Sequence, residues 1–304
     1  MSSFGKRVYL GALAAAAIVL VAACGSSGSG GSSSSSSAAP AAAATTGASS
    51  GTSTSTSAAS ASSSKTYVLA TSADFPPFSS RAADDPNTII GFEPDMMKAV
   101  MGHLGWKYKW VTSDFDCLIP AVQSGRVDIV VSDVYDTSAR EKVVDFVDYL
   151  KTGLSVMVTS ANASKVHSFM DVCGHPMGIL TGASTELEFG QKASNACKKA
   201  GKPAIDIHSY PAVAQEVPAL ANGTLYAMFE DTITEQLIAN KRPGTLKVVF
   251  DDPEASTPLG MAVKKGGSIE SQLRSGVQWY LGTAQYKADA KKQGFPTSSL
   301  ISKP

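Results

Sequence analysis

The stretch Val127–Arg140, "VDIVVSDVYDTSAR", sets the interpretation of the whole chain. β-Branched residues dominate its beginning, which is typical of an inner strand of a sheet over residues 127–131. The polarity then reverses, and Thr137 is placed to cap a helix predicted over residues 138–150. Arg140 would lie in the first turn of that helix, where the helix dipole favours an anion. A cation at this position indicates that an anionic group is brought to it.

The N-terminus has the pattern of an export signal. Lys6 and Arg7 precede an apolar run over residues 8–22, and small residues follow it. This order is typical of a secretory signal peptide, which we assign to residues 1–23. The apolar run is too short and wrongly flanked for a stable membrane-spanning helix.

The residues after the signal indicate an anchored, flexible tether. Residues 21–24, "VAAC", resemble the lipobox of bacterial lipoproteins, so Cys24 is predicted to be the first mature residue and to carry a lipid. The alternative is an ordinary secreted protein in which Cys24 has no role. The segment 24–64 is almost wholly Ser, Ala, Gly and Thr and cannot bury enough apolar surface to fold. We expect an extracytoplasmic protein held to the bacterial cell membrane, facing the periplasm or the outside, through this lipid alone.

Composition bounds the function of the remaining residues, 65–304. They suffice for two modest cores or one large one. The whole chain has 26 Lys and Arg against 26 Asp and Glu, a formal net charge of zero. No basic stripe and no second apolar segment of membrane length are present, so we expect neither a nucleic-acid partner nor a channel.

Three cysteines remain once Cys24 is assigned to the lipid. An oxidising location favours one disulfide, which we assign to Cys173 and Cys197, with one thiol left over. Cys117 is then expected to be a buried thiol that acts as a small hydrophobe. The alternative is a metal site formed by Cys173, His175 and Cys197, but this spacing lacks a second pair of ligands.

Strand and helix patterns alternate twice along the chain. Strands are expected over residues 66–72, 107–113, 127–131, 175–185, 205–210, 225–231 and 259–266. Helices are expected over residues 91–105, 115–125, 186–201, 212–223, 232–240 and, as one closing helix, 269–294. Such repeated βαβαβ units predict open α/β sheets with a ligand crevice at the carboxyl ends of the strands.

This order predicts two lobes with their ligand pocket between them. Lobe 1 would comprise residues 65–153 plus 258–304, and lobe 2 residues 154–257. Hinge segments are expected near residues 154–159 and 248–261.

Several motifs occur in an order that resembles a known family. They are "ADFPPF", "GFEPDMMKAV", "LIPAVQSGRVDIVVSD", "TSAREKVVDF", "LTGASTE", "FEDT" and "LGMAVKKG", spread over residues 66–295. The chain is similar in these motifs to the extracytoplasmic solute-binding proteins of family 3, which serve ABC importers of polar amino acids. The resemblance implies an α/β fold of the type II periplasmic-binding-protein kind, a free amino acid as ligand, an ABC permease as partner and no cofactor. We expect a monomer.

The resemblance gives Arg140 and Asp231 the main ligand contacts. Arg140 matches the arginine that forms a fork with the ligand α-carboxylate, which agrees with the bidentate geometry of guanidinium and carboxylate. Asp231 matches the acid that receives the α-ammonium. From the residues alone, Arg140 could instead pair with Asp136, and Asp231 could cap the helix over residues 232–240.

Further ligand-binding positions follow from the same motifs. Phe75 and Phe115 match aromatic residues over the ligand, although alone either would more often be core. Leu118 would form an apolar wall. The turn Gly182, Ala183 and Ser184 would offer N–H and hydroxyl groups to the carboxylate. The remaining positions are Ser132, Asp133, Tyr135, Thr137 and Glu230.

Departures from the family pattern bear on specificity. Ser72 stands where members that bind cationic side chains have an acid, which argues against a simple lysine or arginine binder. Asp133, at a position that is usually small, and Glu230 add two carboxylates, so a polar or cationic ligand is favoured. Asp133 could instead be neutralised by Arg140. Tyr135 replaces a small hydroxyl residue and would narrow the site or donate its phenol.

Two alternatives to a binding protein share this scaffold. One is an enzyme similar to secreted cyclohexadienyl dehydratases, with Glu230 or Asp231 as a general acid. The chain has no GxSxG, HExxH or phosphate-loop motif, and we expect no catalysis. The other is a sensory module that acts through a membrane partner. The reading that we favour is a receptor that closes on its ligand by hinge motion.

Overall fold

The structure is a computed structural model that describes residues 65–304, except for the side chains of residues 252–255. The predicted signal peptide over residues 1–23, the lipid on Cys24 and the tether over residues 24–64 lie outside the described residues. They remain predictions.

One large sheet runs through the described residues. Its strand order is β5-β1-β6-β11-β7-β10-β8-β9. The strands are β1 (Thr66–Thr71), β5 (Lys107–Thr112), β6 (Ile129–Val130), β7 (Val144–Thr159), β8 (Pro176–Leu180), β9 (Asp206–Tyr210), β10 (Ala227–Asp231) and β11 (Leu246–Lys264). A small second sheet contains β2 (Asp74–Phe75), β3 (Ser79–Arg81) and β4 (Ile89–Ile90).

Helices follow most of the strands, as the sequence predicts. They are α1 (Phe92–Leu104), α2 (Phe115–Gln123), α3 (Ser184–Lys199), α4 (Val213–Ala221), α5 (Thr232–Lys241), α6 (Glu270–Leu281) and α7 (Ala284–Lys292), with short 3-10 helices at η1 (Phe169–Asp171) and η2 (Thr297–Ser299).

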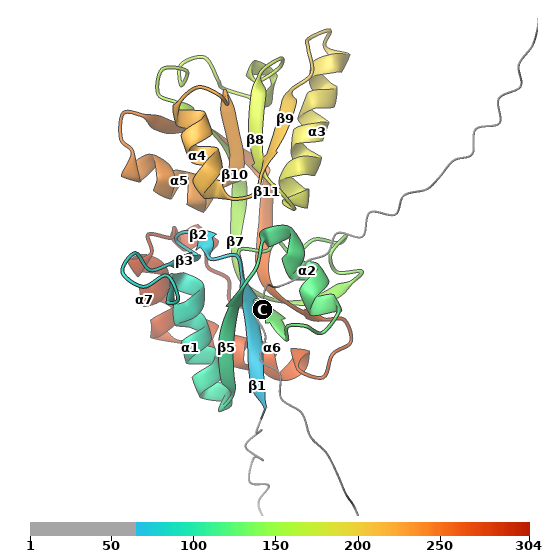
Figure 1. Ribbon diagram of the computed structural model, residues 1–304, viewed down its shortest axis with the longest axis vertical. Helices are drawn as coiled ribbons and strands as arrows, with labels where there is room; N and C mark the ends of the chain where they lie inside the picture. The colour runs from blue at the N-terminus through green and yellow to red at the C-terminus, as the bar shows by residue number, and fades with distance from the viewer. Residues whose placement is uncertain (1–64) are drawn as a thin grey trace, which may run out of the picture. The chain divides into compact units, whose positions relative to one another are not determined.

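The large sheet has two ends joined by two long strands. β1 pairs in parallel with β5 and β6, and β8 pairs in parallel with β9 and β10. β7 and β11 are antiparallel to each other and run through both ends (Figure 1). We call the end with β1, β5 and β6 the first half and the end with β8, β9 and β10 the second half. The crossing segments predicted from sequence are therefore parts of β7 and β11, which make the two halves of the large sheet continuous.

Alternating side chains divide the core between the two faces of the sheet. In β1, Leu69 packs on the side of α1 and α6, whereas the next residue, Ala70, packs on the side of α2. Ile129 and Val130 of β6 divide in the same way. This is the period of two that a strand covered by helices on both faces requires.

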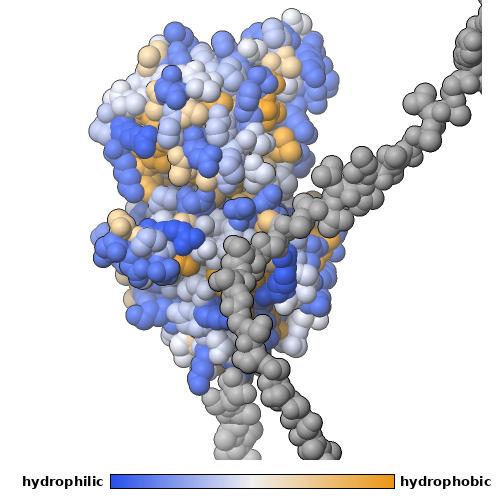
Figure 2. Space-filling view, in the orientation of Figure 1, coloured by the Kyte–Doolittle hydropathy of each residue, from blue (hydrophilic) through white to orange (hydrophobic). Residues whose placement is uncertain are grey.

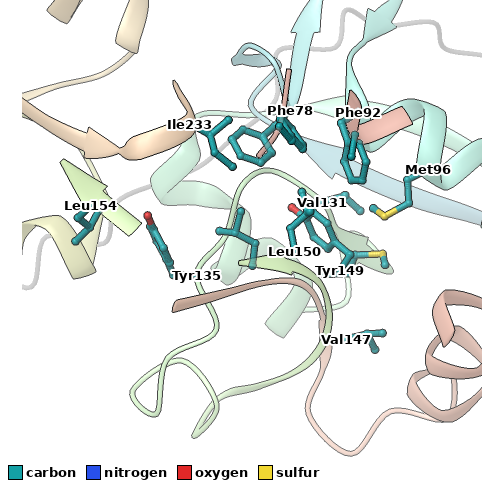
Figure 3. Close-up of a cluster of buried hydrophobic side chains, with 14 of the residues drawn as sticks. Phe78, Phe92, Met96, Val131, Tyr135, Val147, Tyr149, Leu150, Leu154 and Ile233 are labelled. Carbon is teal, nitrogen blue, oxygen red and sulfur yellow. The ribbon is translucent and has the colours of Figure 1, made fainter. Parts of the chain in front are cut away.

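One apolar cluster continues from the first half into the second. It contains Phe92 of α1 in the first half and Phe229 of β10 in the second. Figure 3 shows part of it, with Tyr135, Leu154 and Ile233 near one another between the halves. The two halves therefore meet through packed side chains as well as through β7 and β11.

The prediction of a helix over residues 138–150 is wrong. Residues 138–143 form turns, and β7 begins at Val144. Residues 144–150 are mainly β-branched and aromatic, and β7 pairs with β11 over most of its length. Sheet pairing thus overrides the helical interpretation. Thr137 caps the turn instead of a helix, because its Oγ1 accepts from the Arg140 N–H at 3.3 Å.

The prediction of a single closing helix over residues 269–294 is also wrong. α6 ends at Leu281 with Gly282 as its C-cap, and α7 begins after Thr283. Thr283 Oγ1 accepts from the Tyr286 N–H at 3.2 Å, which caps α7. Gly282 therefore ends α6, and the capping residue Thr283 starts α7.

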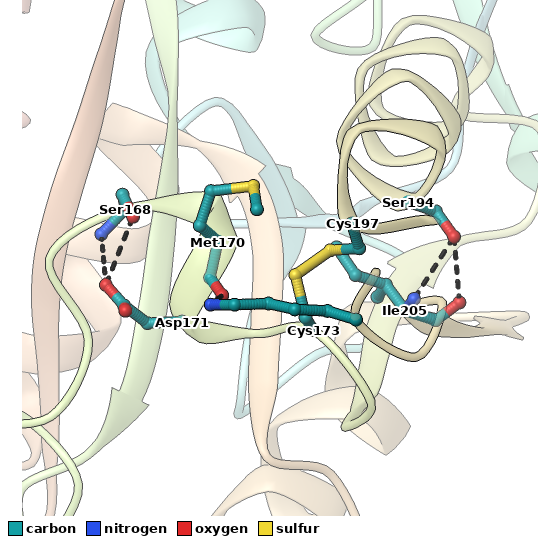
Figure 4. Close-up of a disulfide and its surroundings, with 8 residues drawn as sticks. Ser168, Met170, Asp171, Cys173, Ser194, Cys197 and Ile205 are labelled. Carbon is teal, nitrogen blue, oxygen red and sulfur yellow. Dashed lines mark hydrogen bonds between the residues drawn. A yellow bond between two sulfur atoms is a disulfide. The ribbon is translucent and has the colours of Figure 1, made fainter. Parts of the chain in front are cut away.

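The predicted disulfide between Cys173 and Cys197 is confirmed. Their Cα atoms are 5.7 Å apart, and the bridge ties the chain after η1 to the end of α3 (Figure 4). Both sulfurs are used, which rules out the alternative metal site with His175. The expectation for Cys117 is wrong, because Cys117 is half-buried and disulfide-bonded rather than a buried free thiol.

Within residues 65–304, no helix is both long and apolar enough to cross a bilayer. On the face drawn in Figure 2, hydrophilic residues predominate and apolar side chains form small separate patches.

Candidate functional site

Arg140 lies where the two halves meet. Its side chain is 9% exposed, and its Nη1 donates to the Tyr135 carbonyl oxygen at 3.0 Å. Its Nη2 donates to the carbonyl oxygen of Gly182, which belongs to the second half, at 3.4 Å. We call the region around Arg140, Asp133, Gly182 and Asp231 the junction.

The alternative partners proposed for Arg140 are not used. Among residues 65–304, neither Asp136 nor Asp133 forms an ion pair with it. Burial lowers the pKa of Arg140, and Glu186 is the acid that most offsets this effect. A guanidinium held by two carbonyl oxygens still carries its full charge, so it can meet an anion.

The turn after β8 approaches the first half closely at Gly182. Its φ is +87°, and a Cβ built there would lie 2.8 Å from the Cα of Asp116 in α2. Only a glycine satisfies both the left-handed backbone and this contact. Beside it lies a cavity of about 180 Å³, lined by Phe115, Asp116, Leu118, Ile119, Val134, Arg140 and Gly182.

Asp231 ends β10 and begins α5. Its Oδ1 accepts from the N–H groups of Ile233 and Thr234, both at 2.9 Å, so the predicted helix cap is confirmed. The residue is 1% exposed, and its Oδ2 has no hydrogen-bond donor. Burial raises the pKa of Asp231, whereas the donors from Thr234 lower it. The free oxygen is a site that a cationic group can occupy.

Asp133 is the counterpart of Asp231 in the first half. Its backbone is left-handed, with φ +51°, and its N–H donates to Glu93 Oε1 of α1 at 2.7 Å. The residue is 5% exposed, and its Oδ1 has no donor. Burial, and then the nearby Asp231 carboxyl, raise the pKa of Asp133 well above its ordinary value.

Two further acids at the junction were not predicted from the sequence. Glu186 in the first turn of α3 is buried, and burial raises its pKa to about 7, while Arg140 opposes the shift. Glu93 of α1 is buried and accepts the Asp133 N–H and the Tyr149 hydroxyl. An acid in the first turn of a helix is common because of the helix dipole, so neither residue gave a distinct signal.

The aromatic positions lie beside the same region. The rings of Phe75 and Phe115 are 5.8 Å apart, and Phe75 packs with residues of the second half such as Leu180 and Ala183. Leu118 is buried and lines the cavity beside Arg140. These three residues form an apolar wall from the first half.

Other predicted positions support the loops rather than opening into the cavity. The Ser132 hydroxyl accepts from the Ser72 N–H at 3.0 Å, which ties the ends of β6 and β1 together. The Tyr135 hydroxyl donates to the Gly153 carbonyl oxygen at 3.0 Å. Ser184 is exposed at the start of α3. Glu230 accepts from the Leu180 N–H at 3.0 Å inside the second half.

The two-ended α/β architecture and the charged junction are those of a two-lobed binding protein. The model of the bacterial extracellular solute-binding proteins, family 3, matches residues 67–286, and the chain belongs to this family. The predicted type II periplasmic-binding-protein fold is thereby confirmed. Since the family consists of extracellular binding proteins, the dehydratase-like alternative is set aside.

Individual relatives bind basic amino acids, according to their names. The arginine-binding protein ArgT of Corynebacterium glutamicum is 26% identical over 213 residues, which cover 70% of this chain and 69% of that protein. The lysine/arginine/ornithine-binding periplasmic protein of Escherichia coli is 28% identical over 187 residues, 61% of this chain and 68% of that protein. The structure of an ancestral arginine-binding protein bound to arginine matches with a TM-score of 0.67 and 27% identity, over 75% of this chain and 97% of that chain.

Proposed function

We propose that this protein binds a free cationic amino acid at the junction, with L-arginine as the first candidate. The observation that carries the proposal is the charge pattern of buried groups, one guanidinium against the carboxyls of Asp133, Glu186 and Asp231. An amino acid with a cationic side chain brings one carboxylate and two cations. It therefore complements this pattern better than a neutral or acidic amino acid does.

Each part of the ligand has a matching group. The α-carboxylate would meet Arg140 together with the turn at Gly182, Ala183 and Ser184, because a guanidinium binds a carboxylate bidentately. The α-ammonium would meet the free Oδ2 of Asp231. The apolar stem would lie along Phe75, Phe115 and Leu118. The carboxyl of Asp133 lies beside that of Asp231 and adds a second acid for the same ammonium, whereas Ser72 bonds to Ser132.

Binding would couple to motion of the two halves. We assign lobe 1 to residues 65–153 plus 258–304 and lobe 2 to residues 154–257, with β7 and β11 as the hinge strands. Arg140 and Asp231 belong to different lobes, so a ligand held by both favours the closed form. The closed form would be presented to an ABC permease.

The anchor belongs to the same proposal. We place a lipid on Cys24 and a tether over residues 24–64, which would hold the lobes beside the permease. The intact mass of the membrane fraction tests this assignment, since a lipid adds a mass that Cys24→Ala removes.

A thermal-shift screen of the purified protein against the twenty amino acids and ornithine tests the ligand. A ligand at about 100 times its dissociation constant stabilises the folded form by about 2.7 kcal/mol, a shift of several degrees. We expect arginine, lysine or ornithine to give this shift. A shift with an acidic amino acid alone would contradict the proposal.

A further inference from the structure

Two buried carboxyls face each other across the junction. Asp133 is 5% exposed and comes from the first half, and Asp231 is 1% exposed and comes from the second. Asp133 Oδ1 and Asp231 Oδ2 each lack a hydrogen-bond donor. The two carboxyls are close enough to hydrogen-bond to each other when one of them holds a proton.

The groups around this pair are mostly acidic. Glu93 from α1 and Glu186 from α3 face Asp133, and the Tyr135 hydroxyl lies near both carboxyls. On the side of Asp231, Glu230 of β10 and Glu235 of α5 add further carboxyls. Arg140 is the cation of this group, and its Nη atoms donate to carbonyl oxygens.

Backbone geometry holds Asp133 in this position. The left-handed conformation is unusual for a residue other than glycine, although aspartate and asparagine tolerate it. Glu93 Oε1 fixes it by accepting the Asp133 N–H at 2.7 Å and the hydroxyl of Tyr149 as well. Glu93 is therefore a positioning residue for the pair.

We propose that, in the closed protein, one cation always holds these two carboxylates together. Without ligand this cation is a proton, and with ligand it is the ligand ammonium, so ligand binding releases a proton. The inference rests on the proposed function, because it places the ammonium at Asp231. Two carboxylates in a region of low dielectric cannot both stay ionised without a counterion. The ammonium arrives with its own charge, and the displaced proton passes to the solvent.

Proton release gives the affinity a definite pH dependence. The unliganded pair holds one proton more than the liganded pair, so lowering the pH opposes binding. The affinity should fall by up to about tenfold per pH unit below the pKa at which the pair takes up its proton. Burial and the neighbouring acids raise that pKa above the ordinary range of aspartate.

Calorimetry on the full protein tests the inference with L-arginine as the probe. Titrations near pH 6 in phosphate and in imidazole, whose heats of ionisation differ, count the protons released. We expect about one proton per arginine for the wild type and close to none for Asp133→Asn. Asparagine keeps the left-handed turn and the N–H to Glu93, so this variant should fold. Asp148→Asn is the matched control, because Asp148 is an acid of the first half in a separate surface cavity.

The outcomes are distinct. Equal heats in the two buffers for the wild type, or an unchanged proton count in Asp133→Asn, would overturn the inference. A wild-type dissociation constant that does not change with pH would do the same. If arginine, lysine and ornithine give no binding at all, the proposed function fails and the inference with it, whereas binding without proton release overturns the inference alone.

Discussion

At the scale of single residues, Arg140 should decide whether the ligand carboxylate is held. Replacement by alanine would leave a desolvated carboxylate without its partner, which costs at least about 2 kcal/mol of binding free energy. We expect Arg140→Ala to weaken arginine binding by that amount in calorimetry. Exposed Arg126→Ala serves as the charge-matched control. An unchanged affinity of Arg140→Ala would refute its assigned role.

Asp231 should have two separable roles, because one oxygen caps α5 and the other is free. Asparagine keeps the cap, so Asp231→Asn should retain most of the stability and lose arginine affinity by more than about tenfold. Alanine removes both functions, and Asp231→Ala should also lose about 1 kcal/mol of unfolding free energy. Urea denaturation and calorimetry of the two variants separate the roles. Equal affinity of Asp231→Asn and the wild type would rule out the ammonium contact.

The sequence identifies the two residues predicted to bind the oppositely charged groups of the ligand, but not the buried acids around them. Arg140 and Asp231 could be singled out because the family motifs contain them and because each is a charge that needs a partner, Arg140 in the turn before β7 and Asp231 at the end of β10. Glu93 and Glu186 could not, since an acid in a first helical turn has an ordinary explanation. The role of Asp133 depends on a left-handed backbone angle that follows from Glu93, forty residues earlier in the chain.

At the scale of elements, the turn after β8 should control how closely the two halves meet. Gly182→Ala places a Cβ 2.8 Å from the Asp116 Cα of the first half, which must push the halves apart. Gly201 also has a positive φ, +72°, but nothing lies within 4 Å of its added Cβ. Both alanine variants should lose about 1 to 2 kcal/mol of stability through backbone strain. Only Gly182→Ala should lose arginine affinity, and equal affinities would contradict a closed form that needs this contact.

Element types were predictable wherever local pattern and tertiary packing agree. The alternation of strands and helices was correct because most helices have an apolar face and strands such as β1 and β6 carry β-branched residues. The helix prediction for the segment after Thr137 was wrong because residues 144–150 suit both a helix and a strand, and pairing with β11 decides between them. No local signal reports a partner strand more than a hundred residues away.

At the scale of the whole molecule, two long strands connect both halves and pass the junction. β7 pairs with β10 at Leu154 and with β11 on its other side, so the two strands that we propose as the hinge also form part of each half's core. Movement of the halves must therefore bend strands rather than a loose linker. The continuity of β7 and β11 could not be predicted from the sequence, because residues 246–258 lack a regular alternation of apolar and polar residues.

The acids buried in the second half should make the stability of the protein depend on pH. Glu216 of α4 is fully buried without a donor, and burial raises its pKa to about 8, with Glu186 adding to the shift. In the unfolded chain a glutamate has a pKa near 4.3. Between these values the folded protein binds more protons, so its free energy of unfolding falls as pH rises from about 5 to about 8.

Glu216→Gln should remove this contribution, because glutamine does not titrate and its amide can donate to the neighbouring Glu230. A single group contributes at most about 1.4 kcal/mol per pH unit. Urea midpoints at about pH 5.5 and about pH 8.5 measure the slope, and we expect it to be shallower in Glu216→Gln than in the wild type. Glu188→Gln, an exposed change in α3, should leave the slope unchanged. If Glu216→Gln kept the wild-type slope, the titration would have to reside in other buried acids, with Glu186 first among them.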